Sequence, residues 1–521
     1  MQASYDIAVA GSGFGGSLIA AIARRLGYSV LLVERGSHPR FAIGESTSPL
    51  ANLMIEQISK RYDLPALAPL SEYGRWQRTC PEIVCGLKRG FTYFHHVAGE
   101  AYEADPCGRN QLLVAASPND DVADTHWLRS DVDHFFVRQA IAAGVDYRDH
   151  TTIQPPQRDG DGWIVRGTTE TGGTIETLRT RAGLLIDATG PRGCLSRAFD
   201  IPEGAFANYP ATQSLFTHFT GVPRAEDLPG YSRANSSPPY PIDDAAAHHV
   251  FDGGWMWVLR FGNGVTSAGI AAETWLADEL RLSEGAPAWE RLLDHFPSVR
   301  RQFESARPTR PFIYAPRLSY RAAQAAGPGW AMLPSAATFI DPLFSTGIPL
   351  TLLGIERLAR ILEERPDQAK RDGALHEYGT ITLDEADATA DFISGCYAAM
   401  RDFEVFAALS MFYFAAASYS EMARRLNQPK PGPLFLAAAH AEFGPARRAC
   451  AAEARAGVQD IEAFRRKVAR NIDSLNIAGL ADDSKRNRYD VNFGDLIDNA
   501  TKLGMTPDAM TDFCRKSGWL T

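Results

Sequence analysis

Three glycines near the N-terminus have the spacing of a dinucleotide-binding turn. Gly11, Gly13 and Gly16 form the pattern G-x-G-x-x-G between an apolar run at 6–10 and a helical pattern at 17–26. The first glycine allows the tight turn, the second lets a pyrophosphate approach the backbone, and the third lets helix and strand pack closely. The N-terminus of the following helix then faces the anion.

An acidic residue at the end of the next apolar run supports this interpretation. Glu34 follows residues 30–33, where a carboxylate can accept hydrogen bonds from ribose hydroxyls. The glycine turn is therefore better explained by a dinucleotide site than by a structural turn alone. The order strand, turn, helix, strand is a βαβ unit, which predicts a parallel sheet with helices on its faces. Because the fingerprint occurs once, we expect one dinucleotide site.

A turn-rich segment later in the chain could bind an anion. Phe339, Pro342, Ser345 and Gly347 form the pattern F-x-x-P-x-x-S-x-G immediately before a strongly helical segment. The first N–H groups of a helix have no partner within it, and the helix dipole is positive at that end. The backbone amides of Thr346 and Gly347 are therefore a predicted anion site.

These two segments, with a tryptophan-rich strand between them, resemble the signature of flavin-dependent halogenases. The strand matches the family pattern G-W-x-W-x-I-P at Gly254, Trp255 and Trp257, whereas Leu259 and Arg260 replace its isoleucine and proline. The resemblance implies that reduced FAD (FADH2) and oxygen oxidise chloride or bromide to hypohalous acid, and that the anion held by the Thr346 and Gly347 amides is this halide. It also implies that the two tryptophans keep substrate away from the flavin. A core strand with two aromatic residues is the alternative.

Other segments resemble the FAD-contacting parts of such flavoproteins. These are an Asp-Ala-Thr-Gly turn at 187–190, a Pro-Arg-Phe-x-x-Gly-Glu-Ser loop at 39–46, and Arg129 ahead of a helix. For Arg129 a surface ion pair is the alternative. The FAD-contacting residues that the resemblance implies are Gly11, Gly13, Phe14, Gly15, Gly16, Glu34, Arg40, Ser46, Arg129, Asp187, Asp341 and Gly347.

One departure from the family bears on how FAD is supplied. Many relatives carry Gly-Asp where this chain has Pro334 and Ser335, and the Asp contacts the flavin. Looser binding suits an enzyme that receives reduced FAD from a separate NAD(P)H:flavin reductase. The absence of a second dinucleotide fingerprint in the sequence points to the same partner.

Lys88 is the candidate catalytic residue, in a segment that resembles the Lys-x-Gly-x-Thr/Ser-aromatic segment of halogenases acting on phenols and pyrroles. The chemistry needs a group that receives electrophilic halogen and places it beside the substrate. A desolvated lysine can do so by hydrogen bonding or as a haloamine, and burial lowers its pKa. We expect Arg89 to lower that pKa further. The alternative is an ordinary surface lysine at a strand edge.

Two positions bear on the substrate. Phe344 stands where tryptophan halogenases carry a glutamate, which argues against free tryptophan. A phenolic or pyrrole-like aromatic substrate, free or bound to a carrier protein, is expected instead. His248 and His249 could act as a base, but we interpret them as a surface pair on a loop.

Composition excludes several partners. The net charge of −9 over 521 residues gives no global basic field, so nucleic acid is not expected as a partner. The cysteine count, seven, is odd and fits no zinc pattern, so reduced thiols and a cytoplasmic location are expected, with no metal. The longest apolar run, 405–419, is shorter than a membrane span needs and predicts a buried helix.

The predicted fold class is α/β, with three parts. Residues 1–200 and 325–370 are expected to form a Rossmann-like FAD-binding domain, 201–324 a β-rich substrate lobe, and 371–521 a C-terminal helical domain. A hairpin is predicted around the Asp-Gly-Asp-Gly sequence at 159–162. Two alternatives to a halogenase remain at this point: an FAD-dependent monooxygenase or reductase of the same fold, and a non-catalytic FAD-binding protein.

Overall fold

The computed structural model describes residues 4–231, 237–429 and 431–520. Its first sheet contains the predicted βαβ unit, and the strands on either side of β1 run parallel to it. From one edge to the other, the main path of this sheet is β20 (Ala326–Gly327), β21 (Trp330–Met332), β11 (Thr174–Asp187), β1 (Ser4–Ala10), β2 (Val30–Val33) and β7 (Asp146–Arg148).

Helices cover this sheet and begin at the edge where the glycine turn lies. Helix α1 (Phe14–Arg25) packs against α4 (Arg129–Ala142) and α10 (Gly347–Glu364). The predicted helices at 17–26 and 131–143 therefore exist, but each begins two or three residues earlier than expected. The predicted hairpin is confirmed as β9 (Gln157–Asp159) and β10 (Gly162–Thr171), which pair with Asp159 opposite Gly162.

The second sheet is largely antiparallel and draws strands from three parts of the sequence. Its path is β17 (Arg307–Pro308), β13 (Thr212–Thr220), β16 (Val265–Glu273), β15 (Gly254–Arg260), β14 (Ala246–Phe251), β4 (Gly90–His95), β5 (Gln111–Ala115) and β23 (Arg488–Tyr489). Strands β4 and β5 lie within the range predicted as FAD-binding, and β23 lies within the predicted helical domain. The proposed domain boundaries stay a prediction, and this sheet crosses them.

Smaller elements complete the part of the fold that surrounds the site. A separate two-stranded ladder joins β3 (Cys85–Lys88) to β6 (Asp124–Trp127) in antiparallel register. Three helices pack their apolar residues against the second sheet. These are α6 (Thr274–Leu280), α7 (Ala286–His295) and α8 (Pro297–Phe303). The remaining helices before α10 are α2 (Pro49–Arg61), α3 (Tyr73–Thr79), α5 (Cys194–Ala198) and α9 (Pro334–Ala337).

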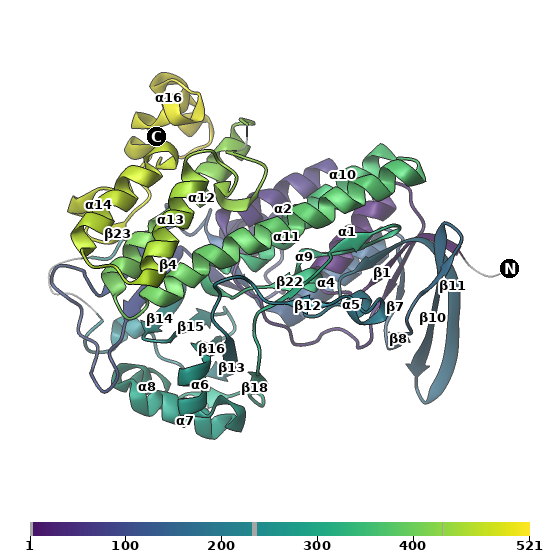
Figure 1. Ribbon diagram of the computed structural model, residues 1–521, viewed down its shortest axis with the longest axis horizontal. Helices are drawn as coiled ribbons and strands as arrows, with labels where there is room; N and C mark the ends of the chain where they lie inside the picture. The colour runs from purple at the N-terminus through teal and green to yellow at the C-terminus, as the bar shows by residue number, and fades with distance from the viewer. Residues whose placement is uncertain (1–3, 232–236, 430, 521) are drawn as a thin grey trace.

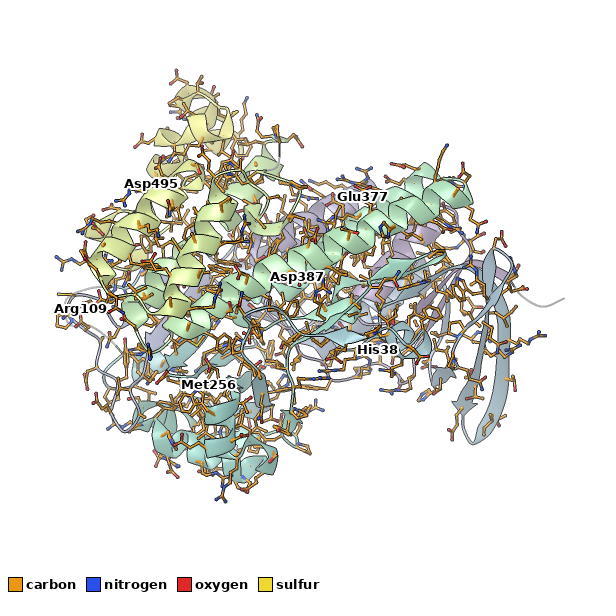
Figure 2. The ribbon with its side chains drawn as sticks, viewed as in Figure 1. His38, Arg109, Met256, Glu377, Asp387 and Asp495 are labelled. Carbon is orange, nitrogen blue, oxygen red and sulfur yellow. The ribbon has the colours of Figure 1, made fainter. Side chains whose placement is uncertain are left out.

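The chain after residue 367 is mainly helical, as predicted. Its helices are α11 (Gln368–Ala399), α12 (Phe403–Arg425), α13 (Phe443–Ala456), α14 (Ile461–Ile472), α15 (Phe493–Asp498) and α16 (Pro507–Lys516). Figure 1 shows α11 running along the molecule from α10 toward the group formed by α12, α13 and α14. Asp387, labelled on α11 in Figure 2, accepts hydrogen bonds from Arg321 at 2.7 and 2.9 Å and so ties the helix to β19 (Tyr320–Ala322).

Helix α12 contains the long apolar run. Among helices of the described chain, it alone has the length and composition to cross a membrane, which by itself is weak support for a span. However, 67% of its most apolar window is buried inside the protein. That burial is the pattern of a core helix, as the sequence predicted.

Candidate active site

A cavity of about 480 Å³ opens beside the glycine turn. We call it the first cavity. It lies between the first sheet's helices and strand β15 of the second sheet. The residues proposed from the sequence that line it are Gly13, Phe14, Gly15, Gly16, Arg40, Ser46, Arg129, Trp255, Trp257, Asp341, Thr346 and Gly347. Gly11, Glu34 and Asp187 do not line it.

The glycine turn has the backbone geometry that its spacing predicts. Gly11 has φ +92°, and a Cβ there would lie 2.5 Å from the carbonyl oxygen of Ala188. A Cβ on Gly16 would lie 1.9 Å from the carbonyl oxygen of Gly11. At Gly13 the nearest atom would be Asp133 Oδ2 at 3.5 Å, an ordinary contact, so this glycine leaves room on the cavity side. The turn therefore needs two glycines for its own packing and offers the third to a ligand.

Glu34 and Asp187 support the turn through backbone groups. Glu34 Oε2 accepts hydrogen bonds from the amide and hydroxyl of Ser12 at 3.0 and 3.2 Å. Asp187 Oδ1 accepts from the Thr189 amide at 2.9 Å, and its Oδ2 accepts from the Leu195 amide at 2.7 Å. These bonds fix the loops at the edge of the first cavity. Direct contacts of the two carboxylates with FAD stay predictions.

Arg129 holds the 39–46 loop over the first cavity. Its guanidinium forms a buried ion pair with Asp133 at 2.8 Å and donates to the carbonyl oxygens of Ile43 and Gly44 at 2.7 and 3.0 Å. Because Arg129 is buried and lines the cavity, the surface ion pair considered from the sequence does not describe it. The Arg129–Asp133 ion pair exists, but it is buried, and Arg129 faces the first cavity.

Lys88, at the end of β3, is completely buried and is not a surface lysine. Its Nζ donates to the carbonyl oxygen of Thr47, lies 3.5 Å from Ser345 Oγ, and stands 3.8 Å from the centre of the Phe91 ring. Burial lowers the pKa of Lys88 to about 7, and the charge of Asp124 opposes that shift. The expected effect of Arg89 is not found, because its guanidinium turns away and pairs with Asp120 at 2.7 Å.

Ser345 reaches Lys88 because the backbone before α10 is unusual. Phe344 and Ser345 have φ of +63° and +56°, the left-handed region that side chains disfavour. Each such residue costs about 1–3 kcal/mol and persists only where the surroundings enforce it. The segment then enters α10 at Gly347, with Thr346 as its N-cap, and both residues line the first cavity. Their amides are thus available at the predicted halide position, which stays a prediction.

The two tryptophans of the G-W-x-W segment face the first cavity from β15. Trp255 Nε1 donates to Asp341 Oδ1 at 3.2 Å and to the Tyr397 hydroxyl at 3.1 Å. Trp257 Nε1 donates to Ser267 Oγ at 3.2 Å. Asp341 also accepts from Tyr397, at 2.7 Å, so its carboxylate is committed to protein donors. The arrangement makes a rigid wall between the cavity and the second sheet, whereas shielding of substrate stays a prediction.

A smaller cavity of about 210 Å³ is lined by Phe91 and Asp124, two neighbours of Lys88. We call it the second cavity. The second cavity is lined by Phe91, whose ring contacts Lys88 Nζ, whereas the first cavity is lined by Ser345. Lys88 itself lines neither cavity, but its side chain contacts one residue of each. Elements from distant parts of the chain close the second cavity, through Asn52, Asp124, Tyr413, Phe414, Glu421, Arg425, Leu436, Phe493 and Trp519.

The aromatic residues of α12 are divided between the second cavity and the protein core. Tyr413 and Phe414 line the second cavity. Phe412 instead packs on Phe443, with ring centres 5.2 Å apart, and Phe403 stacks on His95 at 5.4 Å. Phe344, fully buried, stacks on Tyr413 at 4.7 Å. The position that carries a glutamate in tryptophan halogenases is therefore packed against Tyr413 and lines neither cavity.

Asp124 is the residue that sequence reasoning missed. It lies on β6 directly opposite Lys88, and it is 3% exposed. Its Oδ1 accepts a hydrogen bond from Asn52 Nδ2 at 3.0 Å, whereas its Oδ2 has no hydrogen-bond partner among the described residues. Burial raises the pKa of Asp124 to about 7, and Lys88 opposes that shift. A buried lysine and a buried carboxyl thus face each other beside the second cavity.

Comparison with known proteins places this geometry in a family. The model of the tryptophan halogenase family matches residues 125–406. Monodechloroaminopyrrolnitrin halogenase PrnC of Pseudomonas fluorescens is 30% identical over 411 residues, which are 77% of this chain and 69% of that protein. The chain belongs to the tryptophan halogenase family.

Further comparisons agree with this membership. The tetracycline 7-halogenase of Kitasatospora aureofaciens is 32% identical over 67% of this chain and 61% of its own length. The crystal structure of halogenase PltM in complex with phloroglucinol and FAD matches 92% of this chain and 99% of that chain, with a TM-score of 0.77 and 25% identity. The chain is a flavin-dependent halogenase, and the predicted family, α/β fold class and FAD cofactor are confirmed. The monooxygenase, reductase and non-catalytic alternatives are not favoured.

The residues of the first cavity fit FAD in this halogenase. The open side of Gly13 and the N-terminus of α1 suit a pyrophosphate. Ser46 and Arg40, which line the cavity, each have a buried polar atom, Oγ and Nε, with no hydrogen-bond partner within the described residues. Buried polar groups are rarely left unpaired, so their presence indicates a polar ligand.

Ser46→Ala is expected to weaken FAD binding by about 2- to 10-fold, the effect of one neutral hydrogen bond. Because the hydroxyl has no protein partner in the described structure, its removal should leave the stability of the FAD-free protein unchanged. Fluorescence titration with FAD measures the first quantity and thermal unfolding the second. Ser130→Ala is a matched control, since that hydroxyl bonds Asp131 instead. Equal FAD affinity in wild type and Ser46→Ala would show that this hydroxyl does not contact FAD.

One sequence-based interpretation of this halogenase is wrong. His248 and His249 are buried on β14 and do not form a surface pair on a loop. The ring of His248 stacks on Tyr93 with centres 4.3 Å apart, and burial lowers the pKa of His248 to about 3. No alternation of buried and exposed positions could indicate that these histidines are buried, because both faces of β14 are covered.

Proposed function

We propose that this halogenase transfers oxidised halogen from the first cavity to an electron-rich arene in the second cavity by way of Lys88. When bound, reduced FAD with oxygen supplies the oxidation of halide to hypohalous acid. The observation that carries the proposal is the position of Lys88, which is buried and contacts Ser345 of the first cavity and Phe91 of the second.

The side chain of Lys88 has the properties that such a relay needs. Its donors can hold hypohalous acid by hydrogen bonding, and its lowered pKa makes the neutral amine accessible near neutral pH. Burial excludes bulk water, which would otherwise dilute or consume the oxidant. The amides of Thr346 and Gly347 are the proposed halide site, on the cavity that would hold FAD.

The proposed substrate is a phenolic or pyrrole-like ring, free or carried on a protein. The PltM structure contains phloroglucinol. A second relative, 25% identical over 70% of this chain, is a brominase of 1H-pyrrole-2-carbonyl on a peptidyl-carrier protein from Pseudoalteromonas luteoviolacea. The aromatic wall of Phe91, Tyr413 and Phe414 suits a flat ring, and Phe344 in place of a glutamate disfavours tryptophan.

We further propose that a separate NAD(P)H:flavin reductase supplies the reduced FAD, in the cytoplasm. The single glycine fingerprint in the sequence supports this arrangement. The proposed halide is chloride or bromide.

The function is tested with purified protein, chemically reduced FAD, oxygen and either halide. Resorcinol is the arene probe, and excess free methionine removes hypohalous acid that escapes, since methionine is readily oxidised. Halide-dependent halogenated resorcinol, detected by mass spectrometry in the presence of methionine, is the expected result. FAD oxidation without halogenated product, from resorcinol or from pyrrole-2-carboxylate tested in the same way, would contradict the proposal.

A further inference from the structure

We propose that Asp124 accepts the O–H or N–H proton that the substrate loses during halogenation, and that this proton then returns to Lys88. The inference rests on the proposed function and deepens it, because it assigns a second chemical group at the same site and a requirement on the substrate. The ring must carry a proton that it can give to a carboxylate in the second cavity.

The geometry gives Asp124 one fixed oxygen and one available oxygen. Asn52, on α2, donates to Oδ1 at 3.0 Å and sets the orientation of the carboxyl group. Oδ2 is buried without a partner, on a side chain that lines the second cavity. Buried carboxylate oxygens are normally hydrogen-bonded, so the unpaired one points to a donor supplied by a ligand.

The titratable groups around Asp124 do not compete with it as acceptors of the substrate proton. Lys88 faces it from β3, and Tyr413, Glu421 and Arg425 face it from α12. Glu421 lines the same cavity, but its Oε1 accepts from Arg425 Nε at 2.7 Å, so it is already paired. No contact of 4.0 Å or less joins the charged atoms of Lys88 and Asp124, both of which lie in the described chain. Asp124 therefore lies near Lys88 without forming a direct ion pair with it.

The proposed step balances in atoms and protons. The ring carbon forms a bond to halogen as the O–halogen bond of hypohalous acid breaks, and the departing hydroxide takes a proton from the Lys88 ammonium to become water. The substrate O–H or N–H proton passes to Asp124. When aromaticity returns, the ring C–H proton replaces it on the substrate heteroatom. Water, such as the molecule just formed, then carries the Asp124 proton to Lys88. Arene and hypohalous acid have become haloarene and water.

The electrostatics of the pair agree with this exchange. Burial raises the pKa of Asp124 and lowers the pKa of Lys88, so the two groups differ less in proton affinity than exposed side chains of these types do. A general base works best when its pKa is close to the operating pH. An exposed aspartate, ionised far below neutral pH, would be a much weaker acceptor.

The test compares two probes that differ in the proton at issue. Resorcinol has O–H groups, whereas 1,3-dimethoxybenzene has none. With reduced FAD, oxygen, bromide and excess methionine, Asp124→Asn is expected to lower kcat/KM for resorcinol by about 100-fold or more, the scale of general-base catalysis. The rate on 1,3-dimethoxybenzene should change by less than about threefold, because that ring gives no O–H proton to a base.

The control variant and a separate assay isolate the effect. Asp121→Asn removes a carboxylate three residues away that is exposed and paired with Arg78, and it should leave both rates unchanged. Hypohalous acid formation, followed with monochlorodimedone in the absence of methionine, should be normal in Asp124→Asn. Failure of wild type to halogenate either arene refutes the proposed function. Wild-type activity with equal losses on both probes in Asp124→Asn refutes only the role of Asp124.

The pH profile provides a readout that a structural role would not move. The carboxyl must be ionised to accept a proton, so the wild-type rate on resorcinol relative to the rate on 1,3-dimethoxybenzene, which also needs the Lys88 ammonium, should rise with pH through an apparent pKa well above the usual value near 4. Asp124→Asn should lack this rise, and Asp124→Glu should restore part of it. If Asp124→Asn does not fold, the wild type alone decides: the ratio of the two probe rates must rise with pH over the same range. A constant ratio overturns the proposal.

Discussion

Lys88→Met should lose halogenation of resorcinol by at least about 100-fold while hypohalous acid still forms. Methionine fills a similar buried volume without an N–H donor, so the relay between the cavities is removed and the packing is largely kept. The positioning of a reactive group beside its target commonly supplies factors of this size or more. Product is measured by mass spectrometry with excess methionine present, and hypohalous acid is measured with monochlorodimedone in its absence.

The neighbour of Lys88 supplies the matched control. Arg89→Met removes an adjacent cation that pairs with Asp120 at the surface, and it should leave both measurements close to wild type. If Lys88→Met halogenated resorcinol at the wild-type rate under methionine, the oxidant would reach the arene without Lys88 and the relay would be wrong. If hypohalous acid formation also stopped, Lys88 would be required before the transfer step.

Much of the first cavity could be predicted from the sequence because its determinants are local. The glycine spacing, the flanking apolar runs and the turn before α10 each lie within a few residues of one another, and each was found where expected. Lys88 was identified because its neighbours along the chain resemble a family segment. In these cases the sequence neighbours are also the spatial neighbours, and pattern reasoning needs nothing more.

The second cavity shows where such reasoning ends. Asp124 lies in an Asp-Thr-His-Trp strand without any local signal, and its importance comes from the antiparallel register that sets it opposite Lys88, 36 residues earlier in the chain. Nor could the sequence reveal that Arg89 turns outward while Lys88 turns inward. The only available clue was alternation along a strand, which places neighbours on opposite faces. Burial and strand register determine the pKa shifts of Lys88 and Asp124. The spacing of residues in the sequence predicts neither burial nor register.

Gly16→Ala should destabilise the FAD-binding part of the protein even without FAD. The new Cβ would lie 1.9 Å from the carbonyl oxygen of Gly11 and 2.8 Å from Ala188 Cβ, so β1 and α1 must separate. Overpacking against backbone cannot be relieved by a rotamer change, and we expect a loss of about 3 kcal/mol in the free energy of unfolding. Thermal and urea unfolding of the FAD-free protein measure this loss.

Gly13→Ala tests whether FAD binding, rather than folding, requires a glycine at this position. Its Cβ would meet Asp133 Oδ2 at 3.5 Å, an ordinary contact, so the FAD-free protein should unfold like wild type. The methyl group would instead occupy the side from which a pyrophosphate approaches, and FAD should no longer raise the unfolding temperature. Full stabilisation of Gly13→Ala by FAD would mean that the pyrophosphate does not contact this turn. The two glycines, three residues apart, thus answer different requirements: Gly16 makes room for the protein's own backbone, and Gly13 makes room for the ligand.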